Sequence, residues 1–477
     1  MTYDVLVVGA GSAGCGAAIA AARLGCSVLL LEKSDRIGGN AVRCGVSNWE
    51  PGVGAVGLPF EIYRRLKRLR SAVGIYSFGR HCLWDGFEVF PGGEHRIDPK
   101  RSYVDTLRRY GIGSLLENPG LAKENLHGVS FEPDAYEQTL RSMIDETSMC
   151  NVRLESSITR VYRRSERIDG IDLTDGTRIG ARFFVDASGD ANLCAEAGCD
   201  VVVGQESRET YDEPSAPEKA NNRINGVTLV YRISRKRKSG IDDGNDLSAQ
   251  SCWWRDAFPA ASIVEYPNGD RSVNMLPTME GREFLDGPYD EAYRECFARV
   301  KAHWRFLQDN YAEFRGFAFH SCADAIGVRE SLRVVGEYVL TEHDIRSPVA
   351  PAERDDSIAI ADHAFDRHGE KGGAKELDAP FSIPYRCLIQ KGESNLLIAC
   401  RAASFSSIAA SSCRLSRTML QLGHAAVTAC ALAKRNRLDL PGIDPYELRS
   451  ALRLQGVQLS HPMEPELRRF VEDDTPW

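Results

Sequence analysis

The chain has 477 residues, of which 43% are hydrophobic and 26% charged, and its formal net charge is −8 at pH 7. These values are typical of a globular protein with two or three domains, and the negative charge argues against nucleic acid as a general partner. No run approaches the ~20 apolar residues of a membrane span and no signal peptide is visible, so we expect no membrane association.

The fourteen cysteines are scattered and form no CxxC motif. This usage predicts reduced, mostly buried thiols in a cytoplasmic protein, and it supports neither a disulfide framework nor a metal site. Cys194 and Cys199 have the CxxxxC spacing of a redox disulfide, but they lie far from the first glycine motif. We interpret them as structural cysteines.

Residues 3–39 form the first recognisable pattern, a βαβ unit. The apolar run at 5–8 predicts a buried parallel strand, a glycine-rich turn follows, and small residues at 15–24 predict a helix. A second apolar run at 28–31 predicts the next strand, which ends at Glu32.

The turn of this unit has the spacing GxGxxG. Gly9 permits a tight turn, Gly11 lets backbone N–H groups approach a pyrophosphate, and Gly14 lets the helix pack closely on the strand. The N-terminus of the helix supplies N–H donors and partial positive charge for phosphates. Glu32 lies where an acid accepts the adenosine ribose hydroxyls, and its charge would repel a 2′-phosphate. The unit therefore predicts a dinucleotide site that disfavours NADP.

After this unit, the pattern predicts helices at 61–73 and 134–150 and a β-meander over 152–185. The meander ends in a buried strand at 183–185, which runs into the turn Asp186-Ala187-Ser188-Gly189-Asp190. This position after a meander favours a second nucleotide contact over an ordinary strand–turn–helix connection.

From about residue 201 to 378 the composition is more polar, with strands predicted at 227–233 and 262–266 and a helix at 289–311. We predict a substrate domain inserted into the nucleotide-binding fold. A strand at 396–399 and a long helix over 412–434 complete that fold.

The sequence thus predicts an α/β protein with a three-layer, Rossmann-like domain, which combines a parallel sheet with a β-meander, and an inserted α+β domain. The expected divisions are 1–200 for the first part of the nucleotide-binding domain, 201–378 for the substrate domain, 379–436 for the last part of the nucleotide-binding domain, and 437–477 for a tail with one or two short helices.

Together the motifs resemble the FAD-dependent oxidoreductase family, a glutathione-reductase-class group of two-dinucleotide-binding-domain flavoproteins. Arg36-Ile37-Gly38-Gly39 resembles the RxGG that continues an FAD site, and 186–190 resembles DATGD with Ser188 in place of Thr. The other similar stretches are 329–333, 383–388, 395–401 and 414–426, so the resemblance spans most of the chain. It implies noncovalent FAD and redox chemistry on a small-molecule substrate.

The glycine motifs and the resemblance together give a set of predicted FAD-binding residues. Cys44 lies where the chain commonly passes the flavin ring in this superfamily, and we favour a bystander thiol there over a redox or flavin-linking role. The set is Gly9, Gly11, Ser12, Ala13, Gly14, Glu32, Lys33, Arg36, Gly38, Gly39, Asn40, Cys44, Asp186, Ala187, Ser188, Gly189, Asp190, Arg401, Ser412 and Arg414.

The chemistry of a flavin adds two expectations. Hydride transfer to N5 places negative charge around N1 and the C2 carbonyl, and a helix N-terminus capped near Ser412 would stabilise it. A dehydrogenase also needs a base, for which His320 and His424 are candidates, although a lone histidine is more often structural. Arg329 is a candidate for a functional role, with an ion pair to Glu330 or Glu337 as the equal alternative.

Three positions depart from the family pattern, because Cys400 and Val427 replace glycines and His424 replaces a glutamine. If this segment closes over the flavin, these larger or titratable groups would reshape the pocket or weaken FAD binding.

The favoured function is hydride transfer between a small organic substrate and flavin N5. The alternatives are a flavin-dependent monooxygenase or halogenase, although the WxWxIP halogenase signature is not apparent, and a catalytically degenerate FAD-binding scaffold. The substrate, the electron acceptor and the oligomeric state stay open.

Overall fold

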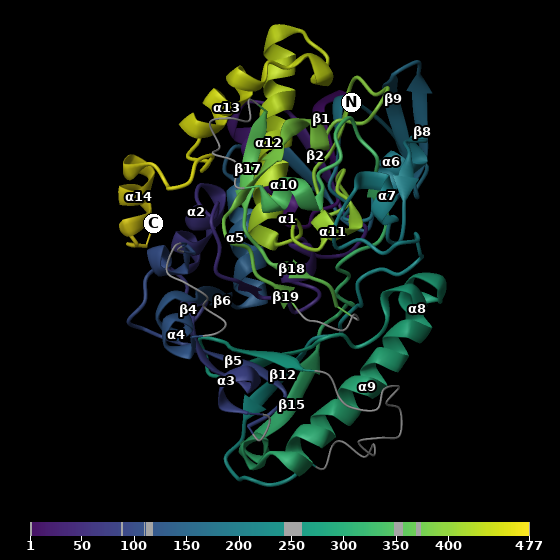
Figure 1. Ribbon diagram of the computed structural model, residues 1–477. Helices are drawn as coiled ribbons and strands as arrows, with labels where there is room; N and C mark the ends of the chain where they lie inside the picture. The colour runs from purple at the N-terminus through teal and green to yellow at the C-terminus, as the bar shows by residue number, and fades with distance from the viewer. Residues whose placement is uncertain are drawn as a thin grey trace.

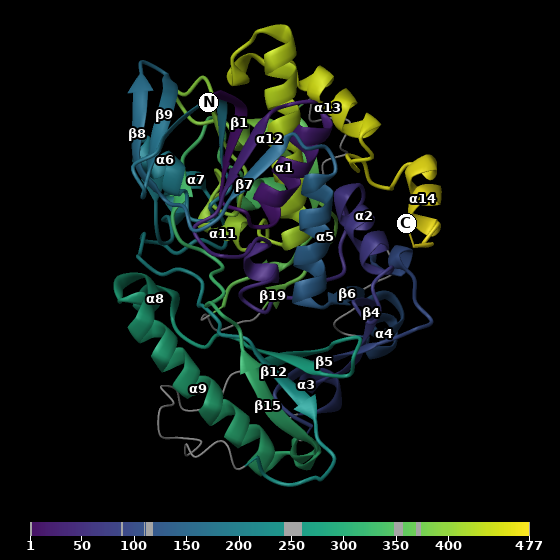
Figure 2. The same ribbon diagram turned by 180° about the vertical axis from the view of Figure 1, so that it is seen from behind.

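The computed structural model describes residues 2–86, 89–108, 110, 118–242, 260–347, 356–368 and 374–476. Two large β-sheets with separate hydrophobic cores organise these residues, as the upper and lower bodies of Figures 1 and 2 show. The first sheet packs with helices α1 (Ser12–Arg23), α5 (Pro133–Asp145) and α12 (Ser416–Asn436), and the second with α9 (Tyr289–Asn310).

The first sheet contains the predicted βαβ unit and the meander. Its strands are β1 (Thr2–Val8), β2 (Val28–Leu31), β7 (Cys150–Arg153), β8 (Ile158–Arg164), β9 (Arg167–Leu173), β10 (Arg178–Asp186) and β21 (Leu396–Ile398). Strands β7, β2, β1, β10 and β21 are neighbours in this order and run parallel. The antiparallel meander β8–β9–β10 leads into them. The predicted combination of parallel sheet and meander is confirmed.

The register of the first sheet brings two distant turns together. Val8, the last residue of β1, pairs with Asp186, the last residue of β10. The glycine turn after each strand therefore leaves the same carboxyl edge, which is where open α/β sheets bind ligands.

Helices α1 and α12 touch through their backbones. A Cβ atom at Gly16 would lie 2.5 Å from the carbonyl oxygen of Leu420, and one at Gly423 would lie 1.9 Å from that of Ala13. This close crossing holds the start of α12 beside the start of α1.

The last long helix begins later than predicted. A short helix, α11 (Ser407–Ala410), precedes it, and α12 starts at Ser416 with Leu415 at the N-cap position and no side-chain cap. Ser412 is buried in the connection and donates a hydrogen bond to the carbonyl oxygen of His363. The predicted capping role of Ser412 is therefore wrong.

The second sheet has the order β15-β12-β14-β13-β5-β4-β6-β3. Its core lies against α9, where Trp304 is fully buried. Its strands come from both sides of the predicted boundary at 200/201, and that domain division stays a prediction. They are β3 (Asn48–Trp49), β4 (Val73–His81), β5 (Gly92–Ile97), β6 (His127–Phe131), β12 (Tyr231–Arg235), β13 (Ala261–Glu265), β14 (Arg271–Met275) and β15 (Phe317–Cys322).

Shorter elements connect these layers. The helices are α2 (Leu58–Leu66), α3 (Cys82–Asp85), α4 (Pro119–Asn125), α6 (Asn192–Glu196), α7 (Arg208–Tyr211), α8 (Gly281–Asp286) and α10 (Glu342–Arg346). The strands are β11 (Val201–Val202), β16 (Arg333–Val334), β17 (Ser357–Ala361), β18 (Phe365–Asp366), β19 (Ala374–Lys375) and β20 (Phe381–Pro384). No helix in the described ranges has the length and apolar character needed to cross a membrane.

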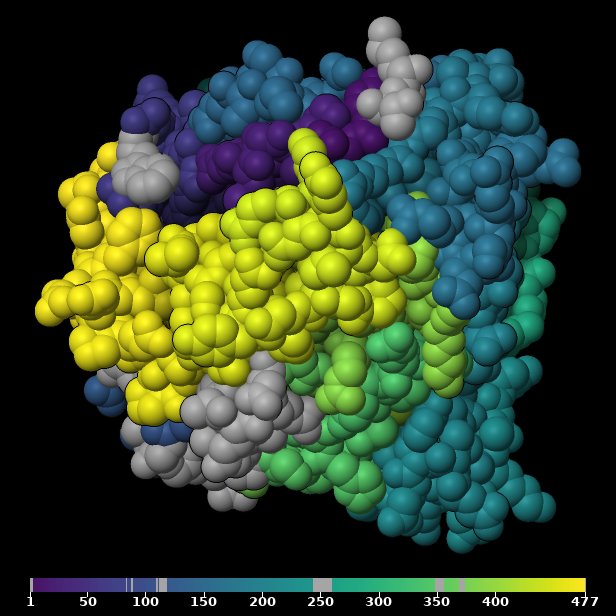
Figure 3. Space-filling view, turned by 90° about the horizontal axis from the view of Figure 1, so that it is seen from above, coloured from purple at the N-terminus to yellow at the C-terminus, as the bar shows by residue number. Residues whose placement is uncertain are grey.

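The C-terminal residues pack against the N-terminal part of the chain, as the adjoining yellow and purple surfaces in Figure 3 show. They form α13 (Pro445–Leu454) and α14 (Pro465–Glu472). The ring of Phe470 lies 5.3 Å from that of Phe60, and Asp474 pairs with Lys67 at 2.9 Å. The predicted tail is thus an integral layer of the fold.

Candidate functional site

A cavity of about 1320 Å³ opens at the carboxyl edge of the first sheet and reaches the second sheet. Both glycine turns line it at one end, and side chains from β4, β5, β13 and β14 line it at the other. Its volume exceeds the roughly 300–1,000 Å³ of ordinary small-molecule sites, so it has room for an extended cofactor together with a substrate.

The first glycine turn is shaped by close backbone packing. Gly9 has φ +95°, and a Cβ atom there would lie 2.6 Å from the carbonyl oxygen of Ala187. A Cβ atom at Gly14 would lie 1.8 Å from the carbonyl oxygen of Gly9. At Gly11 a Cβ atom would meet nothing within 4 Å, and Gly11 lines the cavity. The turn therefore leaves open space at the start of α1, where a phosphate can approach backbone N–H groups.

Glu32 lies at the end of β2 beside this space. It is 8% exposed, its Oε2 accepts a hydrogen bond from the Ala10 N–H at 2.8 Å, and its Oε1 accepts one from the Ser34 N–H at 2.9 Å. Oε1 also accepts from the Ser34 hydroxyl at 2.8 Å, and these bonds fix the carboxylate at the cavity wall, where Oε2 keeps a further lone pair for a ribose hydroxyl.

The second glycine turn is held by two aspartates. Asp186 is fully buried and accepts hydrogen bonds from the N–H groups of Ser188 at 3.0 Å and Cys194 at 2.9 Å, and burial raises its pKa. Asp190 lines the cavity, and its Oδ1 accepts from Arg401 Nη2 and Ser331 Oγ, both at 2.6 Å. Burial disfavours the charge of Asp190, but the nearby Arg401 and Ser331 lower its pKa overall.

The structure brings most of the predicted FAD-binding residues to the cavity. Those that line it are Gly9, Gly11, Ser12, Ala13, Glu32, Lys33, Gly39, Asn40, Cys44, Ala187, Ser188, Gly189, Asp190, Arg401 and Arg414. Gly14, Gly38, Asp186 and Ser412 do not line it, and they shape the surrounding turns instead.

Arg36 also lies away from the cavity wall. Its guanidinium pairs with Glu137 at 2.6 Å and Asp134 at 2.5 Å, both on α5. The arginine therefore ties the RxGG segment to a helix, and we do not keep it as a direct FAD contact.

Neither histidine predicted as a base lines the cavity. His320 is exposed on β15 with its Nδ1 3.0 Å from Ser321 Oγ. His424 is buried between α12 and α13, where its Nε2 lies 2.7 Å from Gln455 Oε1 and burial lowers its pKa. Because a base must reach the substrate, we carry neither prediction forward.

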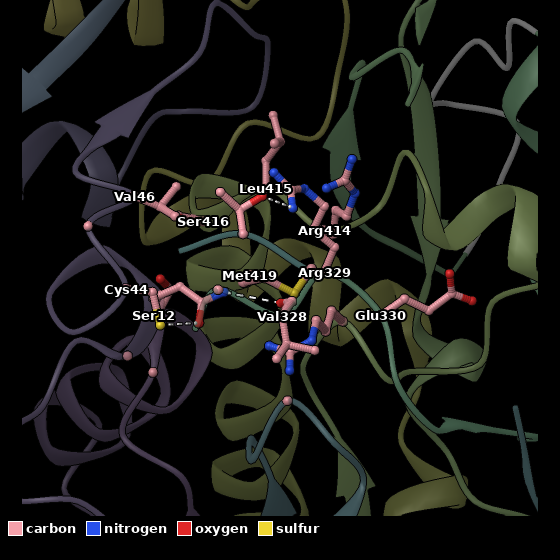
Figure 4. Close-up of a pocket in the computed structure, with 18 of the residues that line it drawn as sticks. Ser12, Cys44, Val46, Val328, Arg329, Glu330, Arg414, Leu415, Ser416 and Met419 are labelled. Carbon is pink, nitrogen blue, oxygen red and sulfur yellow. Dashed lines mark hydrogen bonds between the residues drawn. The ribbon is translucent and has the colours of Figure 1, made fainter. Parts of the chain in front are cut away.

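Arg329 does line the cavity. Its Nη1 donates to the carbonyl oxygen of Gly226 at 2.9 Å and to Thr228 Oγ1 at 2.7 Å. Glu330 points away, as Figure 4 shows, and pairs with Arg333 and Asn225. The alternative role of Arg329, an ion pair with Glu330, is therefore wrong, and the described residues show no ion pair with Glu337. Burial, and then the charge of Arg414, lowers the pKa of Arg329 to about 9.

Three cavity residues between β17 and β19 were not predicted from the sequence, namely His363, Asp366 and His368. Asp366 Oδ2 accepts from His368 Nε2 and from Arg414 Nη2, each at 2.7 Å, and lies 3.7 Å from His363 Nε2. On its other side, His363 Nδ1 lies 3.4 Å from Glu50 Oε2. We call Arg329, His363, Asp366, His368 and Arg414 the histidine–arginine cluster.

The pKa values of the two histidines of this cluster are shifted in opposite directions. Burial disfavours the charged form of His363, but the carboxylates of Glu50 and Asp366 outweigh it and raise the pKa. For His368 burial dominates and lowers the pKa to about 4, so its ring is neutral at pH 7. The only sequence signal for this arrangement was two histidines placed around one aspartate, HxxDxH, without a known motif.

The thiols of the two described cavity cysteines, Cys44 and Cys400, have raised pKa values. Cys44 Sγ donates to Asn40 Oδ1 at 3.3 Å, and burial raises the pKa of its thiol to about 12. A protonated thiol is a poor nucleophile, which favours the bystander interpretation. Of the three departures from the family pattern, Cys400 lines the cavity, whereas His424 and Val427 do not.

Comparison with known proteins gives a family model and one partial relative. The model of the FAD dependent oxidoreductase family matches residues 4–452. A 3-oxosteroid 1-dehydrogenase from Rhodococcus opacus is 38% identical over 190 residues, which are 39% of this chain. The match spans about a third of that relative's length, 33%.

Solved structures with a similar arrangement are distant in sequence. A geranylgeranyl bacteriochlorophyll reductase-like protein from Thermoplasma acidophilum has 13% identity and a TM-score of 0.46, over 100% of this chain and 97% of the other. The p-nitrophenol 4-monooxygenase from Pseudomonas putida has 9% identity and a TM-score of 0.44, over 98% and 92%. At these values the similarity carries no argument about activity. Because the family model covers nearly the whole chain, the protein belongs to the FAD dependent oxidoreductase family and is an enzyme with FAD as its cofactor.

Proposed function

We propose that this enzyme transfers a hydride between a small organic substrate and N5 of FAD. The observation that carries the proposal is one continuous cavity, which runs from the glycine turn and Glu32 to the histidine–arginine cluster. We call the end of the cavity that contains Gly9, Gly11, Glu32, Asp190 and Arg401 the cradle. The cavity joins this cradle to groups that can bind a substrate and accept its proton.

The cradle residues fit FAD. Glu32 would hold the adenosine ribose, the N–H groups at the start of α1 would hold the pyrophosphate, and Asp190 and Arg401 would bind the part that leads to the ring. Bound FAD would supply a hydride acceptor at N5, with negative charge developing around N1 and the C2 carbonyl.

The start of α12 is suited to that negative charge. Leu415 and Ser416 line the cavity, and no side chain caps the free N–H groups of this helix. A helix N-terminus carries a partial positive charge of about half a unit. We place the ring-facing helix start at Ser416, four residues after the position expected from sequence.

His363 is the proposed general base that accepts the substrate's proton. It lines the cavity, and the two carboxylates beside it raise its pKa, which makes the deprotonated ring a stronger base. Asp366 is a positioning residue, because it lies between His363, His368 and Arg414. His363 would take the proton that leaves the substrate when the neighbouring C–H bond gives up its hydride.

The proposal is tested with the purified holoenzyme under anaerobic conditions. Released cofactor should be FAD, and at least one member of a panel of sugars, amino acids and hydroxy acids should bleach the visible absorbance of the bound flavin. Oxygen uptake against dye reduction then separates an oxidase from a dehydrogenase. A holoenzyme that no substrate reduces, but that hydroxylates or halogenates after chemical reduction and exposure to oxygen, would contradict hydride transfer from the substrate.

A cytoplasmic location also stays part of the proposal, supported by the free thiols of the described cysteines.

A further inference from the structure

Three cationic groups that line the cavity, Lys33, Arg329 and Arg417, have no ion pair within the described part of the chain, and of these Lys33 is exposed to solvent. Arg401 pairs with Asp190 and Arg414 pairs with Asp366. Arg329 has no ion pair with any described residue, and its hydrogen-bond partners there are neutral, the Gly226 carbonyl and the Thr228 hydroxyl. Burying a guanidinium without a carboxylate is unfavourable unless a ligand supplies the negative charge.

The unpaired part of Arg329 has the shape of a carboxylate receptor. Both neutral partners bind Nη1, so the edge formed by Nε and Nη2 has no partner among the described residues. This edge makes side-on, two-bond pairs with carboxylates, as Arg178 does with Asp172 at 2.9 and 3.3 Å elsewhere in the chain. Thr228 and the Gly226 carbonyl meanwhile fix the guanidinium in place.

The surroundings of Arg329 favour an anion. Figure 4 shows Arg329 and Arg414 close together, on the other side of the cavity from Ser12 and Cys44. Burial and the charge of Arg414 lower the pKa of Arg329, whereas Asp366 and Glu50 act in the opposite direction. Arg417 lines the same cavity, but its two Nη atoms are fully buried and have no hydrogen-bond partner among the described residues, whereas Arg329 keeps partial exposure at the cavity, where a ligand can reach it.

We infer that the substrate is a small organic acid, and that the Nε–Nη2 edge of Arg329 binds its carboxylate in a side-on, two-bond pair. The inference rests on the proposed function and names the substrate class. A carboxylate on Arg329 would lie within the histidine–arginine cluster and hold the rest of the substrate beside His363. Arg329 then selects the substrate, and His363 handles its proton.

The test measures binding separately from turnover. Isothermal titration calorimetry on the FAD holoenzyme uses acetate, lactate, succinate, benzoate and phenylacetate, each against its primary amide. At least one acid should bind with a saturable heat, and its amide should not. The variant Arg329→Gln should weaken that acid about 10- to 100-fold, as expected for charged hydrogen bonds. Arg329→Lys keeps the positive charge but cannot form the two-bond pair, so its affinity for the acid should lie between those of the wild type and Arg329→Gln. Arg178→Gln, a surface arginine with the same type of pair, should match the wild type.

Flavin content and unfolding temperature show whether each variant is folded, and if Arg329→Gln is not, Arg329→Lys carries the test through a smaller but measurable loss of affinity for the acid. Absence of binding by every acid, equal binding of acids and amides, or undiminished binding by the variants would overturn the inference. An enzyme reduced only by neutral substrates would overturn it too, while the proposed function stands. Carboxylates that bind through Arg329 to an enzyme that no substrate reduces would support the site and refute hydride transfer.

Discussion

The two ends of the cavity are built in different ways. At the cradle, backbone groups from two turns form the site, and the lack of side chains at Gly9, Gly11 and Gly14 gives it the necessary space. At the histidine–arginine cluster, charged side chains from segments far apart in sequence meet, with Arg329, Asp366 and Arg414 among them. The cradle therefore depends on shape and the cluster on charge, so that each should fail under a different kind of substitution.

The largest effect is expected from adding one methyl group to the cradle. Gly14→Ala would place Cβ 1.8 Å from the Gly9 carbonyl oxygen and should cost about 3 kcal/mol or more of unfolding free energy, with loss of FAD. Gly11→Ala meets nothing within 4 Å, so the apoprotein should unfold at the wild-type temperature while FAD affinity falls at least about tenfold. Thermal unfolding of the apoproteins and FAD titration measure both. Wild-type FAD affinity in Gly11→Ala would show that the phosphates lie elsewhere.

The next largest effect is expected on the rate at the cluster. His363→Asn should slow substrate-dependent flavin reduction about 10²- to 10⁴-fold with unchanged FAD content. In the wild type, the rate should rise with pH as His363 loses its proton, through a pKa above 6.5, and this rise should vanish in the variant. Stopped-flow reduction across a pH series measures it. His320→Asn, outside the cavity, is the matched control, and an equal loss there would refute the assignment.

Acid should act on the second sheet before the first. Burial lowers the pKa of His95 to about 4 and that of His303 to about 3, and both pack within the second sheet and α9. Between pH 6.5 and these values the unfolded chain binds more protons than the folded one, so stability falls as pH falls. At pH 4.5 His303 alone accounts for about 3 kcal/mol.

Hydrogen exchange at pH 7 and, after rate correction, at pH 4.5 measures this difference by region. Acid should lower protection in β12 and α9 more than in β1. His303→Gln should lessen the pH dependence of the unfolding free energy by a comparable amount. Equal acid sensitivity of His303→Gln and the wild type would contradict the buried, neutral state of this ring.

The smallest effect is expected at a departure from the family pattern. His424→Gln restores the family residue, and its amide can still bond Gln455, so stability should change by less than about 1 kcal/mol. FAD content and flavin reduction should not change, because His424 lies outside the cavity. Cys400→Gly should instead alter the flavin absorbance spectrum, because Cys400 lines the cavity. The reverse pattern would mean that the cavity wall is wrongly assigned at α12.

The same contrast explains what could be predicted from the sequence. The cradle is local, so strand, turn and helix signals at 5–32 specify Gly9, Gly11 and Glu32 together. The cluster depends on folding, because Arg329, His363 and Arg414 lie far apart in the sequence and meet only at the cavity. A cationic or imidazole side chain carries no local signal of its neighbours, which is why His320 and His424 were chosen and His363 was missed. The start of α12 was misplaced because Ser412 follows capping preferences, whereas a separate short helix intervenes.

The central claim is that one cavity holds FAD in a fixed direction, with its adenosine at Glu32 and its reactive ring at the cluster. A crystal structure of the FAD-bound enzyme tests it most directly. The account predicts the adenosine ribose hydrogen-bonded to Glu32, the flavin pyrimidine edge against the backbone at Leu415–Ser416, and His363 and Arg329 facing the ring. A flavin ring outside the histidine–arginine cluster, with the start of α12 turned away from it, would contradict the account.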